Sequence, residues 1–474
     1  MPRFLRAAAI GCLLFSSTAF AQVGEIFVDQ NATTGANTGD SWADAFLDLQ
    51  DGIDAAEGQS GDFNHVLVAH GTYNAPTVRF PNGSTDARGF SYVMLDQVHL
   101  HGGFLGGAGG STNYHNPDGS FSETIISGAR ATGAGFYHVV GLDDSFMGNT
   151  VIDGFHILGG DATGDPDFQD RDSDRGGGIY CEGSELRLEN VTVRENHATY
   201  GGGIRVKAPT QGTRNFGVKS SVITLNQATR GAGMFVEQIS TEVHLCNVRF
   251  DNNGSVENTT HGGGLYTDFF TTLKASNCLF TNNKADIAGA GIYSVTNSQA
   301  GQVDDHEWRH CTIANNYLDT VPIVPEAAQL GAGIHYEGSG QDVQYLGNSI
   351  VYGNVGGQDA YAFPAGTLAY EYSDIGRVVG GTSLTGNISM NPLFVNAAGG
   401  DFRLKLPGPL LPGSPCLDTA SDTSIGLDFL DLNDNKNYND SLPFDLEMRA
   451  RLIDVPNVGG SDTADMGAYE TPNG

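Results

Sequence analysis

Apolar and polar residues alternate in short runs along this chain, and the runs recur at nearly the same phase. Six of them open with a glycine-rich triplet followed by an aliphatic residue, and the triplets begin at Gly176, Gly201, Gly231, Gly262, Gly289 and Gly331. The first glycines are 25, 30, 31, 27 and 42 residues apart. A repeat of this length with a drifting period is typical of a solenoid, in which each unit forms one coil.

Aligning the repeats gives three strands per coil, and every second residue of each strand is apolar. A period of two places these residues on one face, so stacked coils bury them in a continuous core. We therefore predict an all-β fold, a parallel β-helix with three strands per coil. In the glycine-led strand the inward pairs are Ile179/Cys181, Ile204/Val206, Met234/Val236, Leu265/Thr267, Ile292/Ser294 and Ile334/Tyr336. The second strand supplies Leu186, Phe216, Val243, Leu273 and His306, with Leu188, Val218, Leu245, Ala275 and Trp308.

Asparagines recur at the turns between the strands. One row contains Asn196, Asn226, Asn253, Asn283, Asn316 and Asn354, and a second row, six residues earlier, contains Asn190, Asn247, Asn277 and Asn348, with Ser220 and His310 as substitutes. Asparagine side chains stacked about 4.8 Å apart can form hydrogen bonds from coil to coil. We therefore predict a structural role for both rows.

Changes in this pattern divide the chain. Residues 1–21 carry Arg3 and Arg6, then an apolar stretch, and end with Ala19-Phe20-Ala21, which predicts a secretory signal peptide. Residues 22–150 are expected to form an N-terminal cap and the first irregular coils, 151–385 the regular β-helix, and 386–474 a β-rich C-terminal cap.

A helical N-terminal cap is predicted by a second pattern. Ser41 is followed three residues later by Asp44, a spacing typical of a helix start. Apolar residues then fall at helical spacing, at Trp42, Ala45, Phe46, Leu49 and Ile53. Such a helix would cover the open end of the first coil.

The charge of the chain limits its partners. Its formal net charge is −31, and removal of Arg3 and Arg6 with the signal peptide leaves 22 basic against 55 acidic residues, or −33. Such a surface repels nucleic acid, and it favours divalent cations, above all Ca²⁺ outside a cell. Five cysteines remain in the mature chain. Two of them, Cys278 and Cys311, share an inward column, where buried thiols are expected more than a disulfide.

The repeat motifs resemble those of known families. The glycine triplets, together with Phe250-x-x-Asn253 and Phe280-x-x-Asn283, resemble the GGAI and FxxN repeats of chlamydial polymorphic outer-membrane proteins. The whole chain looks more like secreted bacterial right-handed parallel β-helix proteins with a choice-of-anchor Q type C-terminal region. That resemblance is carried by Asn391-Pro-Leu-Phe-Val395, Asp401-Phe-Arg-Leu404, Gly413-Ser-Pro-Cys-Leu-Asp418 and Asp465-Met-Gly-Ala-Tyr-Glu470. It implies a right-handed solenoid.

These observations also predict a location. We expect a monomer that is secreted to the extracellular space or cell surface, with the periplasm as an alternative. The last ~80 residues are too few and too polar for the membrane barrel of the chlamydial proteins. No membrane span and no nucleic-acid partner are expected.

The first candidate site is the outward face of the glycine-led strand. Aromatic residues there alternate with acidic ones, and an aromatic stripe beside an acidic stripe suits a sugar chain. The alternative is that the rings only stabilise the sheet through cross-strand contacts. The candidate residues are Tyr180, Glu182, Arg205, Phe235, Glu237, Tyr266, Asp268, Tyr293, His335 and Glu337.

Two acidic segments are candidate Ca²⁺ sites. The loop from residue 161 to 175 contains Asp161, Asp165, Asp167, Asp170, Asp172 and Asp174, which would repel one another unless solvated or bridged by a cation. The segment after residue 427 contains Asp428 and then Asp431, Asn433 and Asn435 at alternating positions, but it lacks the glycine and glutamate of a calcium loop. A plain Asn/Asp turn is the alternative there.

No catalytic motif is present, and the catalytic residues remain unknown. We expect a secreted surface or adhesin-like binding protein with an extracellular polysaccharide as its ligand, no required cofactor, and a possible structural Ca²⁺. The alternative is a Ca²⁺-dependent polysaccharide lyase or a glycoside hydrolase, which rests on fold analogy and on the Asp-rich loop. A purely architectural role is the third possibility.

Overall fold

The computed structural model describes residues 24–33, 35–57, 64–74, 78–79, 88–107, 123–131, 133–142, 149–164, 173–207, 215–237, 242–254, 260–269, 271–296, 305–319, 330–338, 342–363, 368–409, 411–453, 455 and 464–472. The predicted signal peptide, residues 1–21, lies outside this part of the chain.

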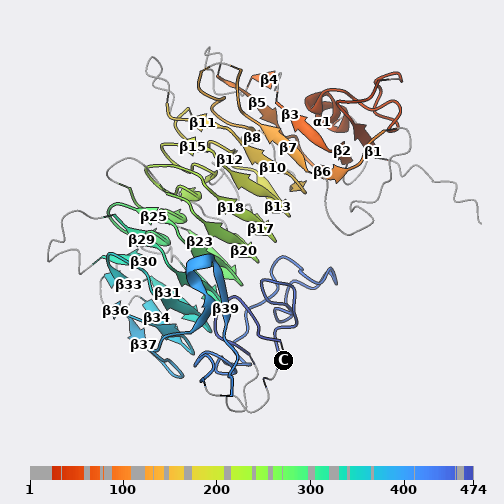
Figure 1. Cartoon of the computed structure of the whole chain (residues 1–474). Helices are drawn as coiled ribbons and strands as arrows, with labels where there is room; N and C mark the ends of the chain where they lie inside the picture. Colours follow the sequence, from red (N-terminus) through yellow and green to blue (C-terminus); the bar gives the residue numbers. More distant parts are fainter. Residues whose placement is uncertain are drawn as a thin grey trace, which may run out of the picture.

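Three long sheets run side by side along the molecule (Figure 1). In the described residues, the sheet called A here has 12 strands, sheet B has 10 and sheet C has 11. Sheet A contains, in spatial order, β1 (Glu25–Val28), β2 (Asn64–Ala69), β6 (Val98–Phe104), β9 (Asn149–Asp153), β13 (Glu185–Glu189), β17 (Phe216–Lys219), β20 (Glu242–Cys246), β23 (Thr272–Ser276), β27 (Asp305–Arg309), β31 (Val343–Gly347), β34 (Leu368–Glu371) and β37 (Thr382–Ser383).

Sheets B and C follow the same order of coils. Sheet B contains β3 (Gly71–Tyr73), β7 (Thr124–Ser127), β10 (His156–Leu158), β14 (Thr192–Arg194), β18 (Val222–Thr224), β21 (Arg249–Asp251), β24 (Leu279–Thr281), β28 (Thr312–Ala314), β32 (Ile350–Tyr352) and β35 (Asp374–Ile375). Sheet C contains β4 (Val78–Arg79), β5 (Phe90–Val93), β8 (Val140–Leu142), β12 (Ile179–Glu182), β16 (Ile204–Lys207), β19 (Met234–Glu237), β22 (Leu265–Thr267), β26 (Ile292–Val295), β30 (Gly331–Glu337), β33 (Gln358–Phe363) and β36 (Val378–Val379).

Strands within each sheet come from successive coils and pair in parallel. Among the described strands, only β4 with β5 and β38 (Phe394–Asn396) with β39 (Asp401–Leu404) pair antiparallel. Two short parallel pairs follow turns of the solenoid. They are β11 (Asp161–Ala162) with β15 (His197–Ala198), and β25 (Lys284–Ala285) with β29 (Tyr317–Leu318). The chain is therefore a parallel β-helix with three strands per coil, as predicted.

The interior matches the columns predicted from the sequence. In sheet C, Ile204 is the register partner of Met234, and Met234 that of Leu265. All three are fully buried in one core that runs through the coils. His306 and Trp308 also point inward and are fully buried, as their positions in the alignment predicted. All five described cysteines are buried and free. Burial raises the pKa of Cys181 to about 12, so its thiol is unreactive at neutral pH.

The glycine triplets are explained by two separate constraints. In five of the six triplets, all except the one that begins at Gly331, the first glycine has a left-handed backbone, with φ of +67° at Gly201. The third lies too close to the next coil for a side chain, because a Cβ on Gly203 would be 2.5 Å from the carbonyl oxygen of Gly233. The triplet thus allows a tight turn and then close stacking of the coils.

The asparagine row from Asn196 to Asn354 forms a continuous buried ladder. The Asn226 side-chain amide donates to Asn253 Oδ1 at 3.1 Å, and Asn253 donates to Asn283 Oδ1 at 3.1 Å. The same acceptor oxygens also bind backbone N–H groups; Asn226 N, for example, donates to Asn253 Oδ1 at 3.1 Å. This row therefore has the predicted structural role.

The main role of the second asparagine row is to allow a left-handed backbone at the turns, and its side chains do not form a continuous ladder. Its members have left-handed conformations, with φ of 49–57°: Asn190, Ser220, Asn247, Asn277, His310 and Asn348. Asparagine adopts this conformation more readily than most residues. Direct side-chain bonds join only some neighbours in the described chain, among them Asn277 Nδ2 to Asn247 Oδ1 at 2.9 Å.

The N-terminal helix is shorter than predicted. Helix α1 spans Leu49–Glu57, whereas a start at Ser41 was expected. Residues 41–44 form a turn instead, in which Asp44 N donates to Ser41 Oγ at 3.2 Å. Trp42 does not belong to the helix. Its ring lies 5.0 Å from that of Phe27 and 5.7 Å from that of Phe104, in a separate cluster outside the core. The helix buries Leu49 and Ile53 against the first coils, so the capping role fits the prediction.

The C-terminal segment returns along the side of the solenoid. Figure 1 shows it in blue beside the later strands of sheet A. Its described part contains β38, a 3₁₀ turn at Ala397–Gly399 and β39, and the rest is mostly turns. The segment binds the solenoid at several coils. Arg309 Nη1 donates to Ser424 O at 2.7 Å, and Lys219 Nζ donates to Asp431 O at 2.8 Å.

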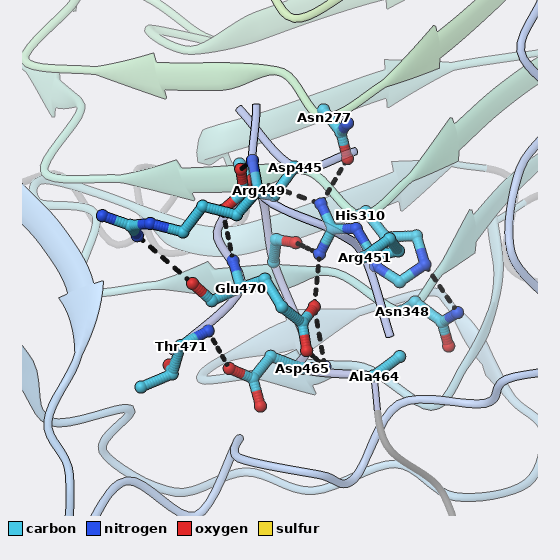
Figure 2. Close-up of polar contacts among 12 residues, drawn as sticks. Asn277, His310, Asn348, Asp445, Arg449, Arg451, Ala464, Asp465, Glu470 and Thr471 are labelled. Carbon is cyan, nitrogen blue, oxygen red and sulfur yellow. Dashed lines mark hydrogen bonds and ion pairs between the residues drawn. The ribbon is translucent and has the colours of Figure 1, made fainter. Parts of the chain in front are cut away.

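A buried polar network fixes the end of this segment (Figure 2). Arg451 is 1% exposed, and it donates to the side chains of Asn277 and Glu470 and to the carbonyl oxygens of Gly467 and Ala468. Glu470 in turn accepts a bond from Asp465 N at 3.3 Å. The last sequence motif, residues 465–470, thus docks the segment onto the turn that contains Asn277.

No helix in the described residues has the length and hydropathy needed to cross a bilayer.

Candidate functional site

The predicted aromatic stripe forms one register column on the outer face of sheet C. Tyr180 pairs with Arg205, Arg205 with Phe235, Phe235 with Tyr266, Tyr266 with Tyr293, and Tyr293 with His335. Successive rings lie 5.0–5.1 Å apart from Phe235 to Tyr361. Sequence reasoning therefore placed these residues in the correct column.

Their predicted exposure is wrong. The side chains of the column from Tyr180 to His335 are only 1–6% exposed. The rings cover one another, and residues of the turns before each strand pack over them, among them Tyr200, Ile287 and Leu330. Arg230 adds a cation, 5.7 Å from the ring centres of both Tyr200 and Tyr266. A sugar cannot reach the faces of these rings, so the column stabilises the sheet instead.

The acidic positions next to this column form ion pairs. Arg205 is 1% exposed and donates to Glu182 at 3.2 Å and to Glu237 at 3.1 Å. Arg175 contacts Glu237 at 2.5 Å, and Lys207 contacts Glu182 at 2.6 Å. Burial alone would raise the pKa of Glu182, but Arg205, Lys207 and Tyr180 lower it to about 2. These charged groups neutralise one another.

The other two acids of the stripe differ. Burial raises the pKa of Asp268, whose Oδ1 accepts a bond from Phe269 N at 3.0 Å. Glu337 is half exposed, and its Oε1 lies 3.0 Å from His335 Nε2. The hydrogen bond with His335 lowers the pKa of Glu337, although burial opposes this.

The Asp-rich loop is only partly described. Asp165, Asp167, Asp170 and Asp172 lie outside the described residues. Asp161 contacts Arg88 at 3.4 Å, and Asp174 contacts Arg175 at 3.3 Å. Each of these two acids therefore has a cationic partner from the protein itself, and Ca²⁺ binding by the loop stays a prediction.

The second acidic segment forms a series of side-chain-capped turns. Both carboxylate oxygens of Asp428 accept Leu432 N at 2.8 Å, and Asp431 Oδ1 accepts Asn435 N at 2.8 Å. Asn433 Oδ1 also accepts Asn435 N, at 3.1 Å. This is the Asn/Asp-turn alternative. Ca²⁺ binding here also stays a prediction.

A groove that the sequence reasoning missed lies between the outer face of sheet A and the C-terminal segment. It has a volume of ≈ 480 Å³. Its wall on sheet A includes Glu185, Arg187, Glu242, His244 and Lys274, and its opposite wall includes Phe429, Leu430, Tyr438 and Asn439. Gly217 leaves room for this wall, because a Cβ there would lie 2.9 Å from Leu430 Cδ2.

Aromatic and charged groups meet in this groove. The His244 ring stacks on Phe429 with centroids 4.9 Å apart, and Lys274 Nζ lies 4.9 Å from the centre of the same ring. Glu242 binds both partners, at 2.9 Å to His244 Nε2 and 3.1 Å to Lys274 Nζ. Tyr438 is 46% exposed. The alternation of β20, Glu242-Val-His244, indicates an outward column, but for this second strand of the coil the sequence alignment considered only the inward columns.

Three histidines meet at the other end of sheet A. They are His65 on β2 and His99 and His101 on β6, and all three are half-buried. Each offers a ring nitrogen, and these nitrogens lie within 4.8 Å of one another. This group was also missed, although His99-Leu-His101 alternates on one strand and His65 is the register partner of His99.

The comparisons with known proteins concern the fold. Residues 153–350 match the family described as right handed beta helix region. The β-helix is therefore right-handed, as the resemblance implied. Among solved structures, the chain is similar to one titled "Crystal structure of pectate lyase Pel9A", with 11% identity and a TM-score of 0.42 over 94% of this chain and 96% of that one. No curated protein matches.

Proposed function

We propose that this protein is an extracellular saccharide-binding protein and that its ligand occupies the groove between sheet A and the C-terminal segment. The observation that carries the proposal is the position of Phe429 and Tyr438 opposite the polar side chains of Glu242 and Lys274. Saccharide sites commonly combine a ring, on which the apolar face of a sugar stacks, with polar groups that bind its hydroxyls.

The proposed saccharide site therefore lies on sheet A and not on sheet C, where the sequence predicted it. On sheet C the aromatic faces are covered, whereas Tyr438 in the groove is 46% exposed. Phe429 is half-buried and already contacts His244 and Lys274, so Tyr438 is the more open of the two rings. The groove, like the stripe, places rings beside acids, here Phe429 and Tyr438 beside Glu185 and Glu242.

The charge in the groove supports a saccharide ligand. Two acids, Glu185 and Glu242, face two bases, Arg187 and Lys274, on a chain whose net charge is −31. Local neutrality lets the groove accept either a neutral sugar or a uronic acid, which the rest of the surface would repel. We therefore include both kinds of saccharide in the test.

The test is a glycan array followed by titration calorimetry with the mature chain, with and without Ca²⁺. Phe429→Ala and Tyr438→Ala should each weaken binding at least about fivefold, as expected for an aromatic contact worth about 1 kcal/mol or more. Phe363→Ala is the matched control, since Phe363 is 61% exposed on sheet C. Equal affinity in the wild-type protein and both groove variants would disprove the groove site, as would no retention of any glycan.

Catalysis is the competing outcome. A polysaccharide lyase would release unsaturated products that absorb ultraviolet light, and a glycoside hydrolase would release new reducing ends. Incubation of retained polysaccharides with the protein, with and without Ca²⁺, measures both. Retention without product is expected, and either product would overturn the binding-only proposal.

The extracellular location is part of the same proposal. It depends on the predicted signal peptide, with cleavage expected after Ala21. Expression of the full chain in a bacterial host should yield a secreted or periplasmic form. Its intact mass should equal that of a chain that begins at Gln22. An uncleaved cytosolic protein would contradict it.

A further inference from the structure

The three histidines on sheet A bring three ring nitrogens close together. His65 Nδ1 lies 3.0 Å from His101 Nε2, and the ligand-capable nitrogens of all three residues lie within 4.8 Å of one another. The rings of His65 and His101 are nearly parallel, at 20°, with centroids 5.2 Å apart. Their positions on two adjacent strands of a regular sheet fix this arrangement, because side chains on one face alternate with core residues.

A carboxylate orients one of the histidines from behind. Asp153 on β9 is the register partner of His101, and its Oδ2 lies 3.3 Å from His101 Nδ1. Asp153 Oδ1 is itself held by Asn190 Nδ2 at 2.9 Å. A proton on His101 Nδ1 that bonds to Asp153 leaves the lone pair of Nε2 directed toward His65. Carboxylates behind metal-binding histidines have this role in many metal sites.

We propose that His65, His99 and His101 bind a divalent transition-metal ion of the zinc class and that Asp153 is a positioning residue. Zinc binds imidazole nitrogen at about 2.0–2.1 Å, so two nitrogens of a tetrahedral site lie about 3.4 Å apart. The 3.0 Å separation of His65 and His101 is close to that value, and rotation of the His99 ring would complete the set.

The chemistry of the donors selects the metal. Three imidazoles without a coordinating carboxylate favour zinc, copper or nickel over calcium and magnesium, which prefer oxygen ligands. Zinc sites with three protein ligands keep a fourth position for water or another small ligand. The ion would also join β2 to β6, and so brace the first coils of the solenoid.

The competing explanation is a direct hydrogen bond between His65 and His101. Two imidazoles 3.0 Å apart satisfy each other when one nitrogen carries a proton. That arrangement needs neither His99 nor a metal ion. The two explanations therefore differ in whether all three histidines affect metal binding.

Zinc itself is the probe. The mature chain is dialysed against zinc, and the bound metal is measured per chain, together with the visible absorption of the cobalt form. We expect one ion per chain and a four-coordinate cobalt spectrum. His65→Ala, His99→Ala and His101→Ala should each abolish stoichiometric binding, while His70→Ala, which changes an exposed histidine of the same region, should leave it unchanged.

Asp153→Asn tests the positioning role without removing a ligand. Zinc should still bind with one ion per chain, but about 10–100-fold more weakly. Circular dichroism establishes that each variant is folded, and if an alanine variant does not fold, His→Gln at the same position replaces it. Absence of zinc binding by the wild-type protein, or full retention by the three histidine variants, would overturn the proposal. The result does not depend on saccharide binding, since no glycan is present.

Discussion

The Arg451 guanidinium lies 3.3 Å from the Glu470 carboxylate, and both side chains are almost completely buried between the C-terminal segment and the solenoid. Burial raises the pKa of Glu470 to about 9, although Arg451 opposes this shift. We therefore predict that the carboxyl group retains a proton at neutral pH and that Arg451 is held mainly by the carbonyl oxygens of Gly467 and Ala468.

This relationship predicts unequal effects of mutating the two partners. Arg451→Ala should destabilise the protein by about 3–5 kcal/mol, because several buried acceptors lose their donor. Glu470→Gln should be much milder at pH 7, since a neutral amide of the same shape replaces a protonated carboxyl group. Chemical unfolding measures both, with Arg403→Ala, an exposed arginine of the same segment, as the control. Equal losses at positions 451 and 470 would show that Glu470 is ionised.

The asparagine ladder predicts a large effect from one amide. Asn253→Ala removes the acceptor of both Asn226 N and Asn226 Nδ2 in a fully buried environment. We expect a loss of about 1–3 kcal/mol for each group left unsatisfied. The free energy of unfolding of Asn253→Ala, compared with that of the exposed Asn31→Ala, checks this. A loss no larger than that of the control would mean that the ladder contributes little.

The close approach of neighbouring coils predicts that replacing the third glycine of a triplet with a larger residue destabilises the protein. Gly203→Ala would place a Cβ 2.5 Å from Gly233 O and 2.9 Å from Asn226 Nδ2, so the stacked backbones must separate. We expect about 1–3 kcal/mol of destabilisation. Gly408→Ala is the matched control, because a Cβ there has no heavy atom within 4 Å. Thermal unfolding that ranks the two variants equally would contradict the steric argument.

The ion pairs of Glu182 predict a loss of stability in acid. The folded-state pKa, about 2, lies below the ordinary 4.5, so the contribution is complete above pH 4.5 and is lost as pH falls toward 2. Because Glu182 keeps some contact with solvent, we expect about 1–2 kcal/mol. Unfolding free energies measured across this range should fall less steeply in Glu182→Gln than in the wild-type protein or in Glu195→Gln, which changes an exposed acid. Parallel curves for all three would exclude this role.

The sequence alone was sufficient to predict the structural features that recur from one coil to the next. The inward columns, the glycine triplets and the asparagine ladder all arise from the same contact between neighbouring coils, so alignment of the repeats reveals them. His306 and His310 illustrate this point. His306 aligns with an inward column and His310 with the second asparagine row, which predicted a structural role for both, and both are fully buried.

The features that depend on chain segments outside the repeat could not be found in this way. The column from Tyr180 to His335 was placed correctly, but side chains of the preceding turns, such as Tyr200, cover it. The groove requires Phe429 and Tyr438 to come back to β20 and β23 from more than 150 residues away in sequence. The start of α1 was misplaced for a local reason, since Ser41 and Asp44 close a turn of their own.

The amides of the asparagine ladder all point the same way. Each donates to the next coil, from Asn196 through Asn354, and the last one donates to the Asp359 carboxylate at 3.0 Å. Their small dipoles therefore add along the axis, with the positive end at the later coils. The anionic Asp359 stands at that positive end, much as an acidic residue stands at the start of a helix. The ladder thus gives the solenoid an electrical polarity, and a chain shortened before residue 359 would leave that polarity without its counter-charge.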